Sequence, residues 1–375
     1  MTESIPFIDL QAQRKRLGGS LDKAIAAAVA GGQWILGPQV FELEEKLARF
    51  ADVKHAIACA NGTDALLLIL RAWNIGPSDA VFVPAFTFAA TAEVVALAGA
   101  TPVFVDVLPD TYNIDPESLD AAIAMVRRDG LLEPRAAIAV DLFGQPADYR
   151  KLMPVVEAAN LRLLCDSAQA FGATLNSRST VSFGDAAATS FFPAKPLGCY
   201  GDGGACFTND DELAARLRSL RMHGQESQSY EYERIGLNSR LDTIQAAILI
   251  EKLGIFSDEI ETRQAIAARF DRAMRQSPAI RTPEVIAGAR SVWAQYTIRV
   301  RDRSRIQAHL KDVGIPARIY YPAPLPHQPA YRSFPSVPIP VSTELCNEVL
   351  SLPMHPYLSE ADQQRIIEAV LQSAP

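Results

Sequence analysis

The sequence is poor in cysteine, and the few cysteines are not arranged for cross-linking or metal binding. Only five of the 375 residues are cysteines, and no two of them form a C-x-x-C pair. Disulfide-stabilised secreted domains need an even set of paired cysteines, and structural zinc sites need closely spaced ligands. The cysteines therefore indicate reduced thiols in a cytoplasmic protein, and we expect no metal site.

Long apolar runs and an excess of positive charge are also missing. No apolar stretch approaches the ~20 residues that a membrane-spanning helix needs. The N-terminal segment MTESIPFIDLQAQRKR lacks the basic and then apolar layout of a secretion signal. The 43 acidic residues outnumber the 36 lysines and arginines, which argues against a general nucleic-acid-binding surface. We expect a cytoplasmic protein that binds neither membranes nor nucleic acids.

Short apolar runs that alternate with helical patterns are abundant in the first two thirds of the chain. Buried strands are predicted at 55–60, 80–85, 102–107, 136–143, 161–166, 186–192 and 203–209, and helices between several of them at 64–73, 115–128 and 148–159. Near-continuous apolar strands that alternate with helices indicate an α/β fold. We expect a mostly parallel seven-stranded sheet with helices on both faces.

The pattern changes after about residue 250. A long polar helix is predicted at about 256–277, followed by a strand at 293–300 and a helix near 304–313. A proline-rich stretch at 320–340 precedes two closing helical patterns, and we expect it to form an irregular loop that reaches the surface. These features indicate a large domain of residues 1–250 and a smaller C-terminal α+β domain of residues 251–375.

Polar residues at predicted strand ends are the first candidates for a site, because parallel sheets bind ligands at the carboxyl ends of their strands. NGTDA (61–65) follows a strand and opens a helix. Gly62 permits a tight turn, Thr63 adds a hydroxyl, and the free N–H groups of a helix start can bind a phosphate. The alternative is an ordinary helix N-cap made by Thr63 or Asp64.

Asp166 ends another predicted strand, in LRLLCDSAQAFG. A buried carboxylate is costly unless it is paired. A pyridinium N–H would be a suitable partner, and capping a following helix is an equally good explanation.

Lys195 lies in SFFPAKPLGCYGDGGA, among aromatic residues and prolines and ahead of four glycines. Apolar surroundings lower the pKa of a lysine and favour the bond that its amine forms with an aldehyde. The alternative is a lysine that extends from a loop into solvent. The density of glycine favours a tightly folded backbone, and Ser190 offers a hydroxyl at the preceding strand end.

These residues together match the needs of pyridoxal 5′-phosphate, which requires an amine for its aldehyde, an acid for its ring nitrogen and an anchor for its phosphate. An aromatic side chain that stacks on the ring is also needed. Phe88 in FTFAAT could supply it, although packing in the core is the simpler explanation for a phenylalanine.

Six segments resemble those of one enzyme family: NGTDAL, FTFAAT, CDSAQAFG, SFFPAKPLGCYGDGGA, RMHGQ and GLNSRLDTIQAAIL. They are similar to the nucleotide-sugar aminotransferases of the DegT/DnrJ/EryC1/StrS group, and the similarity runs from IPFIDL to SLPMHPYL. The resemblance implies a pyridoxal-phosphate enzyme of fold type I, the aspartate aminotransferase-like fold. It also implies a homodimer with active sites at the subunit interface.

The resemblance implies a role for each matching position. Lys195 would bond the cofactor and move protons, Asp166 would hold the pyridine nitrogen, and Gln169 would lie near the phenolic oxygen. Asn238 would reach the phosphate of the neighbouring subunit's cofactor. The full set of implied cofactor-binding residues is Gly62, Thr63, Asp64, Phe88, Asp166, Gln169, Ser190, Lys195 and Asn238. Lysine at 195 favours amino transfer, because the dehydrating branch of the family has histidine there.

The resemblance extends to members that transfer the amino group of L-glutamate to C3 of a UDP-linked 3-oxo-2-acetamido-2-deoxy-uronic acid for bacterial surface polysaccharide of the O-antigen type. Arg240 would meet the uronate carboxylate; the alternative is a helix-start residue in a surface salt bridge. Tyr320, Tyr321 and His327 would contact substrate. Such members often carry His-Tyr-Pro where this sequence has Tyr320-Tyr321-Pro322.

Three alternatives stay open at this point. One is amino transfer to C3 or C4 of a dTDP- or GDP-linked oxo-deoxysugar, which has no carboxylate. The others are a lyase that uses the same cofactor and a non-catalytic regulatory protein that has the same fold. The segment 224–234 is either a substrate flap or a polar loop.

Overall fold

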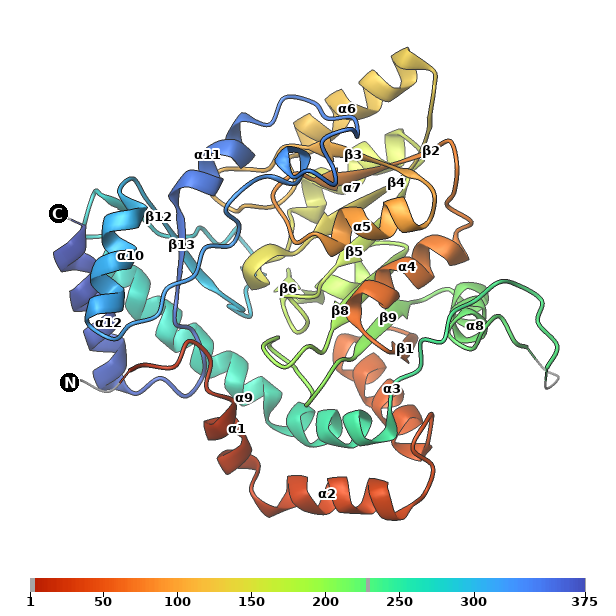
Figure 1. Ribbon diagram of the computed structural model, residues 1–375, viewed down its shortest axis with the longest axis horizontal. Coiled ribbons are helices and arrows are strands. Elements are labelled where there is room, and N and C mark those ends of the chain that lie inside the picture. The colour runs from red at the N-terminus through yellow and green to blue at the C-terminus, as the bar shows by residue number, and fades with distance from the viewer. Residues whose placement is uncertain (1–3, 227–229, 375) are drawn as a thin grey trace.

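A seven-stranded sheet forms the centre of the molecule (Figure 1). The computed structural model describes residues 4–226 and 230–374. The strands lie in the order β1 (His55–Cys59), β9 (Gly204–Thr208), β8 (Ala186–Ser190), β5 (Arg162–Asp166), β4 (Glu133–Val140), β2 (Asp79–Pro84) and β3 (Thr101–Val105). In this sheet β9 runs against β1 and β8, while the other neighbouring pairs are parallel. The predicted mostly parallel seven-stranded sheet is confirmed, and the carboxyl ends of its six co-directional strands meet at one edge.

Helices cover both faces of this sheet, which explains why its strands are apolar on both sides. Successive strand residues point to opposite faces, so that Phe82 of β2 belongs to one core and Val81 and Val83 to another. The first core is closed by α3 (Pro38–Ala51), α6 (Pro116–Asp129), α7 (Tyr149–Ala158) and the first half of α9 (Thr243–Met274). The second is closed by α4 (Gly62–Ala72), α5 (Ala90–Leu97) and α8 (Asp211–Leu220).

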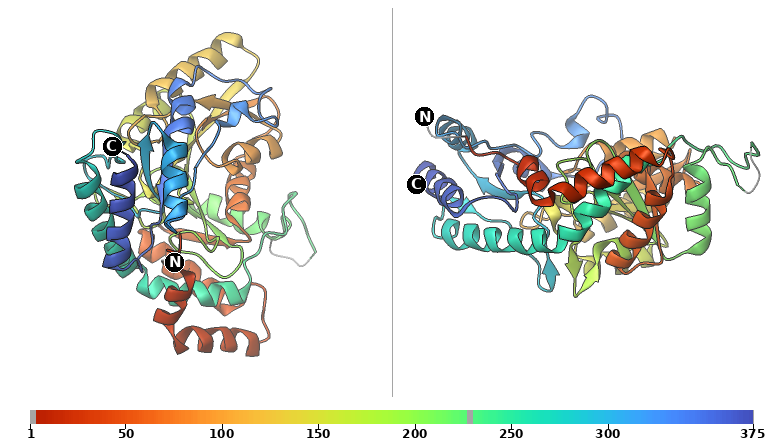
Figure 2. Two further views of the ribbon diagram at one scale, coloured as in Figure 1. Left: turned by 60° about the vertical axis from the view of Figure 1, so that its left-hand side comes forward. Right: turned by 90° about the horizontal axis from the view of Figure 1, so that it is seen from below.

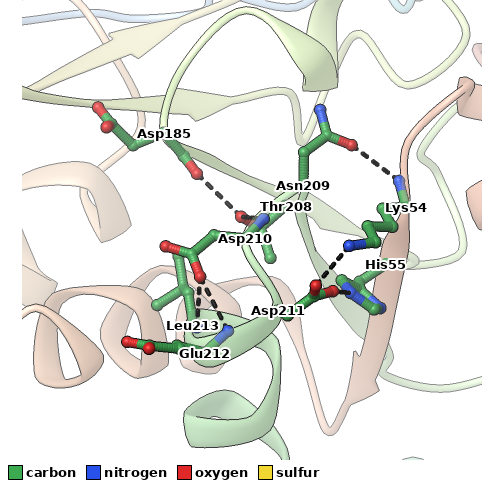
Figure 3. Close-up of polar contacts among 9 residues, drawn as sticks. All are labelled: Lys54, His55, Asp185, Thr208, Asn209, Asp210, Asp211, Glu212 and Leu213. Carbon is green, nitrogen blue, oxygen red and sulfur yellow. Dashed lines mark hydrogen bonds and ion pairs between the residues drawn. The ribbon is translucent and has the colours of Figure 1, made fainter.

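Side chains at the amino end of β1 form ion pairs with the first residue of α8 (Figure 3). Asp210 caps α8 by accepting from the N–H groups of Glu212 and Leu213 at 2.8 and 3.1 Å. The next residue, Asp211, pairs with Lys54 and with Nε2 of His55, the latter at 2.6 Å. These bonds stabilise the edge of the sheet that lies opposite the carboxyl ends of its parallel strands.

The C-terminal part of the chain builds a second, smaller hydrophobic core. Its antiparallel sheet is β10 (Ile280–Arg281), β12 (Tyr296–Val300) and β13 (Val349–Leu352), with α10 (Arg303–Asp312), α11 (Pro340–Glu348) and α12 (Glu360–Ser373). Ile5 near the N-terminus joins this core, and its N–H donates to the Gly314 carbonyl at 3.0 Å. Figure 2 shows the N-terminal segment beside the C-terminal helices.

Helix α9 belongs to both cores and begins earlier than the sequence pattern indicated. It spans Thr243–Met274 rather than about 256–277, and it includes the exposed Gly254 because packing against α3 and α2 (Gly19–Ala30) offsets the low helix propensity of one glycine. Phe256 lies in the first sheet core and Phe270 in the smaller C-terminal core. The predicted boundary at 250/251 falls inside this helix, and the division into two domains there stays a prediction.

Short elements complete the chain: α1 (Leu10–Leu17), β6 (Thr174–Leu175), β7 (Arg178–Ser179), β11 (Ala289–Arg290) and the 3₁₀ turns η1 (Leu142–Gly144), η2 (Thr180–Ser182) and η3 (Leu325–His327). The predicted strand at 136–143 was too long, because the chain leaves β4 after Val140 and Phe143 adopts a positive φ of 60° in η1. The strand predicted at 293–300 begins at Tyr296, after Trp293 with a φ of 50°.

The proline-rich segment returns to the large sheet. The N–H of Phe104 in β3 donates to the Pro335 carbonyl at 3.0 Å, and Val337 N–H donates to the Phe104 carbonyl at 3.2 Å. Leu325 N–H donates to the Ala85 carbonyl, just after β2, at 2.9 Å. The segment is irregular as predicted, and these bonds hold it against β3 and the end of β2.

All five cysteines are buried and free of disulfides. Among the described residues, no helix is long and apolar enough to cross a membrane, and no group of three or more His, Cys, Asp or Glu side chains could hold a metal ion.

His355 makes the stability of the C-terminal part of the chain depend on pH. His355 is 2% exposed, and burial, followed by the nearby Arg263 charge, lowers the pKa of its imidazole from 6.5 to about 4. The folded state therefore binds a proton at His355 less readily than the unfolded chain does. As the pH falls from 6.5 toward 4, the unfolded chain takes up this proton first, and the free energy of unfolding decreases. We expect a loss of about 1.4 kcal/mol of unfolding free energy per pH unit in that window.

Urea unfolding of the wild type and of His355→Gln between pH 7 and pH 4 measures how much of the pH dependence of the unfolding free energy comes from His355. The variant keeps a donor for the Pro6 carbonyl, which His355 contacts at 3.2 Å. The difference between the two proteins should shrink as the pH falls, and parallel pH profiles would contradict the assignment.

Candidate cofactor and substrate site

Most of the predicted site residues meet at the carboxyl edge of the large sheet. Asp166 ends β5, Ser190 ends β8, and Gly62 begins α4 directly after β1. Phe88 lies between β2 and α5. The parallel strands bring these residues together although they lie far apart in the sequence.

Asp166 is a buried carboxylate with two hydrogen-bond donors. Thr91 Oγ1 donates to Oδ2 at 3.1 Å, and the Ala168 N–H donates to Oδ1 at 3.2 Å. Burial raises the pKa of Asp166, while the Ala168 and Thr91 hydrogen bonds and the Lys195 charge lower it. The bond to Ala168 forms a local turn, and no helix follows in this part of the described chain. The explanation of Asp166 as a helix cap is therefore wrong.

Lys195 lies in the turn that follows β8. Its N–H donates to the Phe192 carbonyl at 2.8 Å, and the residue is half-buried. Burial lowers the pKa of its amine, and the Asp166 carboxylate opposes this shift. The half-buried side chain is close enough to Asp166 for their charges to interact, which favours the nucleophilic lysine over a lysine that extends freely into solvent. A half-buried amine with a lowered pKa has the character that a nucleophilic lysine needs.

Gly62 and Ser190 form a narrow cradle. A Cβ atom added at Gly62 would lie 2.6 Å from Cβ and 3.1 Å from Oγ of Ser190. The helix cap here is Asn61, whose side chain accepts from the Asp64 N–H at 2.8 Å, so neither Thr63 nor Asp64 is the cap. The N–H groups of Gly62 and Thr63 have no acceptor among the described residues. They remain available to a phosphate at the positive end of the helix dipole.

Gln169 connects the sheet edge to the proline-rich segment. Its Oε1 accepts from the Phe143 N–H at 2.6 Å, and its Nε2 donates to the hydroxyl of Tyr321 at 3.3 Å. Burial raises the pKa of Tyr321, so this phenol stays neutral. The Tyr321 ring lies 5.9 Å from that of Phe86 and 6.5 Å from that of Phe88.

Phe88 is 58% exposed, which contradicts its explanation as a core residue. An exposed aromatic ring beside Tyr321, at the edge that carries Asp166, can instead cover a planar ligand.

The remaining predicted residues lie around this centre. Asn238 is exposed and forms a bridge with Met222, while the Ser239 hydroxyl accepts from the Ala60 N–H at 3.3 Å. Arg240 is half-buried, and its Nε has no hydrogen-bond partner in the described part of the chain. Part of the segment 224–234, namely residues 227–229, lies outside the described residues.

The two other predicted substrate residues differ in their surroundings. His327 is exposed in η3. Tyr320 packs edge-on against Phe7 at 6.4 Å and is partly buried.

Sequence reasoning missed Thr91 and Asp141. Thr91 was quoted in FTFAAT, but nothing in the sequence indicates that it reaches Asp166. Asp141 follows β4 as Asp166 ends β5, and the same strand-end argument could have found it. It is fully buried and accepts from Ser167 Oγ at 2.6 Å, Tyr149 OH at 2.8 Å and the Ala147 N–H at 2.8 Å. Burial raises its pKa to about 7.

The donor set fits pyridoxal 5′-phosphate. The Gly62–Ser190 cradle is open only because residue 62 lacks a Cβ, and its free N–H groups suit a phosphate. Asp166 is a buried acceptor that suits a pyridinium N–H, and the Lys195 amine suits an aldehyde. Each of the three polar ends of the cofactor therefore finds a group of the matching chemistry.

Comparisons with known proteins agree with this geometry. Residues 16–371 match the DegT/DnrJ/EryC1/StrS aminotransferase family. The chain is 46% identical over 366 residues to the UDP-2-acetamido-2-deoxy-3-oxo-D-glucuronate aminotransferase of Pseudomonas aeruginosa, covering 98% of this chain and 99% of that one. It superimposes with a TM-score of 0.97 on the crystal structure of a DegT/DnrJ/EryC1/StrS aminotransferase from Brucella abortus, at 53% identity and 99% coverage of both chains.

A more distant structure bears on the cofactor. NtdA from Bacillus subtilis, solved with bound cofactor PMP, gives a TM-score of 0.88 at 25% identity, covering 100% of this chain and 86% of that one. PMP is the amine form of pyridoxal phosphate, and the cofactor of the present chain is pyridoxal 5′-phosphate. The fold is that of the pyridoxal-phosphate enzymes of fold type I. From the residues at the sheet edge, the fold and the match over residues 16–371, we conclude that the chain belongs to the DegT/DnrJ/EryC1/StrS aminotransferase family.

Proposed function

We propose that this aminotransferase moves the amino group of L-glutamate to C3 of a UDP-linked 3-oxo-2-acetamido-2-deoxy-uronic acid. The observation that carries this proposal is the 46% identity, over nearly the whole chain, to a Pseudomonas aeruginosa aminotransferase whose name specifies such a sugar. The setting we propose is biosynthesis of bacterial surface polysaccharide of the O-antigen type, in the cytoplasm.

The residues of the site divide the work of amino transfer. When bound, the cofactor supplies a carbonyl carbon that can carry an amino group and a ring that can spread negative charge. Nζ of Lys195 would take the proton from the α-carbon of the amino donor, because burial lowers its pKa and makes the neutral amine more available as a base. The Asp166 carboxylate would hold the proton on the ring nitrogen. The two donors to Asp166, Thr91 and the Ala168 N–H, would orient that carboxylate and favour its ionised form.

The phosphate and the ring would be held by separate parts of the site. The N–H groups of Gly62 and Thr63 and the hydroxyls of Thr63 and Ser190 would bind the phosphate at the start of α4. Phe88 would lie over the ring. Gln169, anchored by the Phe143 N–H, would keep its amide close to the phenolic oxygen.

Arg240 would select the uronate. Its half-buried guanidinium retains an Nε–H without a partner among the described residues, and a carboxylate can accept from two guanidinium N–H groups at once. The alternative substrates, dTDP- or GDP-linked oxo-deoxysugars, have no carboxylate at C6 and would leave this cation unpaired.

We also propose that the enzyme is a homodimer. Trp34 is 58% exposed and Ile235 is 86% exposed. Ile235 lies three residues before Asn238, and the Thr243 N–H donates to the Trp34 carbonyl at 2.8 Å, so both side chains lie on or beside the segment that carries Asn238 and Arg240. Large exposed apolar side chains mark interaction surfaces. A second copy that covers them would bring its own Asn238 to the shared site.

Lys195→Ala tests the proposed base. Loss of both the amine and its proton transfer should lower kcat at least about 10³-fold, and the purified variant should no longer be trapped by borohydride as a covalent adduct at position 195. Mass spectrometry of tryptic peptides measures the adduct. The exposed Lys311→Ala serves as the control and should behave as wild type, whereas full turnover by Lys195→Ala would refute the assignment.

Gly62→Ala tests the phosphate cradle. The added methyl group would lie 2.6 Å from Ser190 Cβ, and relief of this clash must widen the cradle. We expect the dissociation constant of pyridoxal phosphate to rise about 10-fold or more, since each lost charge-assisted hydrogen bond costs about 1.5 kcal/mol or more. Fluorescence titration of the apoenzyme measures it.

The matched control is Gly254→Ala in α9, where an added Cβ meets nothing within 4 Å. That change should stabilise the helix by about 1 kcal/mol and leave cofactor affinity unchanged. Equal affinities for Gly62→Ala and wild type would exclude the cradle as the phosphate site.

Arg240→Gln tests substrate selection. Removal of the guanidinium should lower kcat/KM for the 3-oxo-uronate substrate about 10- to 100-fold, since a hydrogen bond to a charged group contributes about 1.5–3 kcal/mol. Activity toward a 6-deoxy-3-oxo sugar nucleotide should change less than about threefold. If wild type prefers the deoxysugar, or if both activities fall together, the uronate assignment fails while the amino-transfer assignment stands.

A further inference from the structure

The loop that carries Lys195 is folded tightly against itself. It runs from Phe191 to Gly203, between β8 and β9, and its ends are joined by the Phe191 N–H, which donates to the Gly203 carbonyl at 2.7 Å. Inside it, the Cys199 N–H donates to the Phe191 carbonyl at 2.8 Å. A Cβ atom at Gly198 would lie only 2.5 Å from the Phe192 carbonyl oxygen. The position of Gly198 is therefore coupled to the turn that holds Lys195.

Two side chains of helix α9 donate hydrogen bonds to carbonyl groups of this loop. Nζ of Lys252 donates to the Gly198 carbonyl at 2.6 Å, and Nε2 of Gln245 donates to the Tyr200 carbonyl at 3.0 Å. Lys252 and Gln245 are seven residues apart, so they lie on the same face of the helix, two turns from one another. The ammonium group of Lys252 also lies 4.3 Å from the centre of the Tyr200 ring.

Lys252 is unusual because a lysine is rarely buried without an ion-pair partner. The residue is 1% exposed, and in the described part of the chain it forms no salt bridge. Burial lowers its pKa to about 8, against the smaller opposing effects of Cys199 and Glu259. A buried amine without an ion-pair partner is costly, and burying an apolar side chain of the same length would cost less. What the amine adds is a charged donor to the Gly198 carbonyl and a cation against the Tyr200 ring.

We propose that Lys252 is a positioning residue, which holds the 191–203 loop so that the amine of Lys195 points at the cofactor's aldehyde carbon. The inference depends on the proposed role of Lys195. Lys252 acts on the loop backbone through Gly198 and has no contact with substrate in this role.

This role has a consequence that general loosening of the fold does not share. The aldehyde form of the cofactor can bond to the Lys195 amine with loss of one water, whereas the amine form, PMP, cannot. Both forms use the same phosphate cradle and the same Asp166. A displaced Lys195 therefore weakens binding of the aldehyde form selectively, while damage to the whole site weakens both forms alike.

The test compares the two affinities in the full-length apoenzyme. Lys252→Met keeps the length of the side chain and removes the donor and the charge. We expect the dissociation constant for pyridoxal phosphate to rise about 10-fold, in keeping with the loss of one charge-assisted hydrogen bond. The constant for PMP should change less than about twofold. Lys252→Arg restores a cationic donor and should recover at least part of the preference for the aldehyde form.

Three further variants make every outcome decisive. Arg263→Met removes a buried cation from the other half of α9, where it donates to the Trp293 and Met354 carbonyls, and should leave the ratio of the two affinities unchanged. Gln245→Met removes the second tether and should shift the ratio in the same direction as Lys252→Met by about threefold. Gln245→Met also provides the test of the loop tether if Lys252→Met does not fold. Lys195→Ala should abolish the preference for the aldehyde form.

An unchanged ratio in both tether variants, or equal weakening of both forms, overturns the role of Lys252. If Lys195→Ala itself retains the wild-type preference, the proposed function of Lys195 is what fails.

Discussion

The charges of Asp166 and Lys195 share one poorly solvated edge of the sheet, and the site depends on their mutual influence. Burial favours the neutral form of each group, and each group's charge favours the charged form of the other. At Asp166 the hydrogen bonds from Thr91 and the Ala168 N–H favour the carboxylate and so oppose part of the effect of burial on its pKa. Lys195 has no comparable hydrogen-bond support in the described structure, so its amine is the group that is left free to react.

This arrangement requires backbones that approach more closely than side chains normally allow. Gly62 lies against Ser190, and Gly198 lies against the Phe192–Pro193 carbonyls, so the phosphate cradle and the lysine turn are both built at glycines. Backbone without a Cβ can bring the start of α4 and the end of β8 together around a small anion. The outer carbonyls of the tight turn accept hydrogen bonds from Gln245 and Lys252 of α9, the anchors that we propose hold it in place.

The proline-rich segment borders the site on the side of Gln169 and Phe88, and it precedes the C-terminal helices in the chain. Tyr321 reaches Gln169 and the ring of Phe88, while residues further along the segment bond to β3. Gln169 therefore links the proline-rich segment to the η1 turn, since it bonds to both Tyr321 and the Phe143 N–H. Asp141 also connects this region, because its buried carboxylate, at the start of η1, accepts hydrogen bonds from the Ala147 N–H, from Tyr149 of α7 and from Ser167, the neighbour of Asp166.

The sequence by itself determined the strand and helix order of the large domain, since apolar runs of strand length can only be buried between two layers of helices. It also determined which residue types could do the chemistry, because a lysine among aromatics and glycines and an aspartate at a strand end are costly without a function. Only the tertiary structure decided which side chains support them. Thr91, Lys252 and the carbonyl of Gly198 carry no local signal, because their partners lie far away in the chain. The start of α9 at Thr243 and the return of the proline-rich segment to β3 depended on long-range packing in the same way.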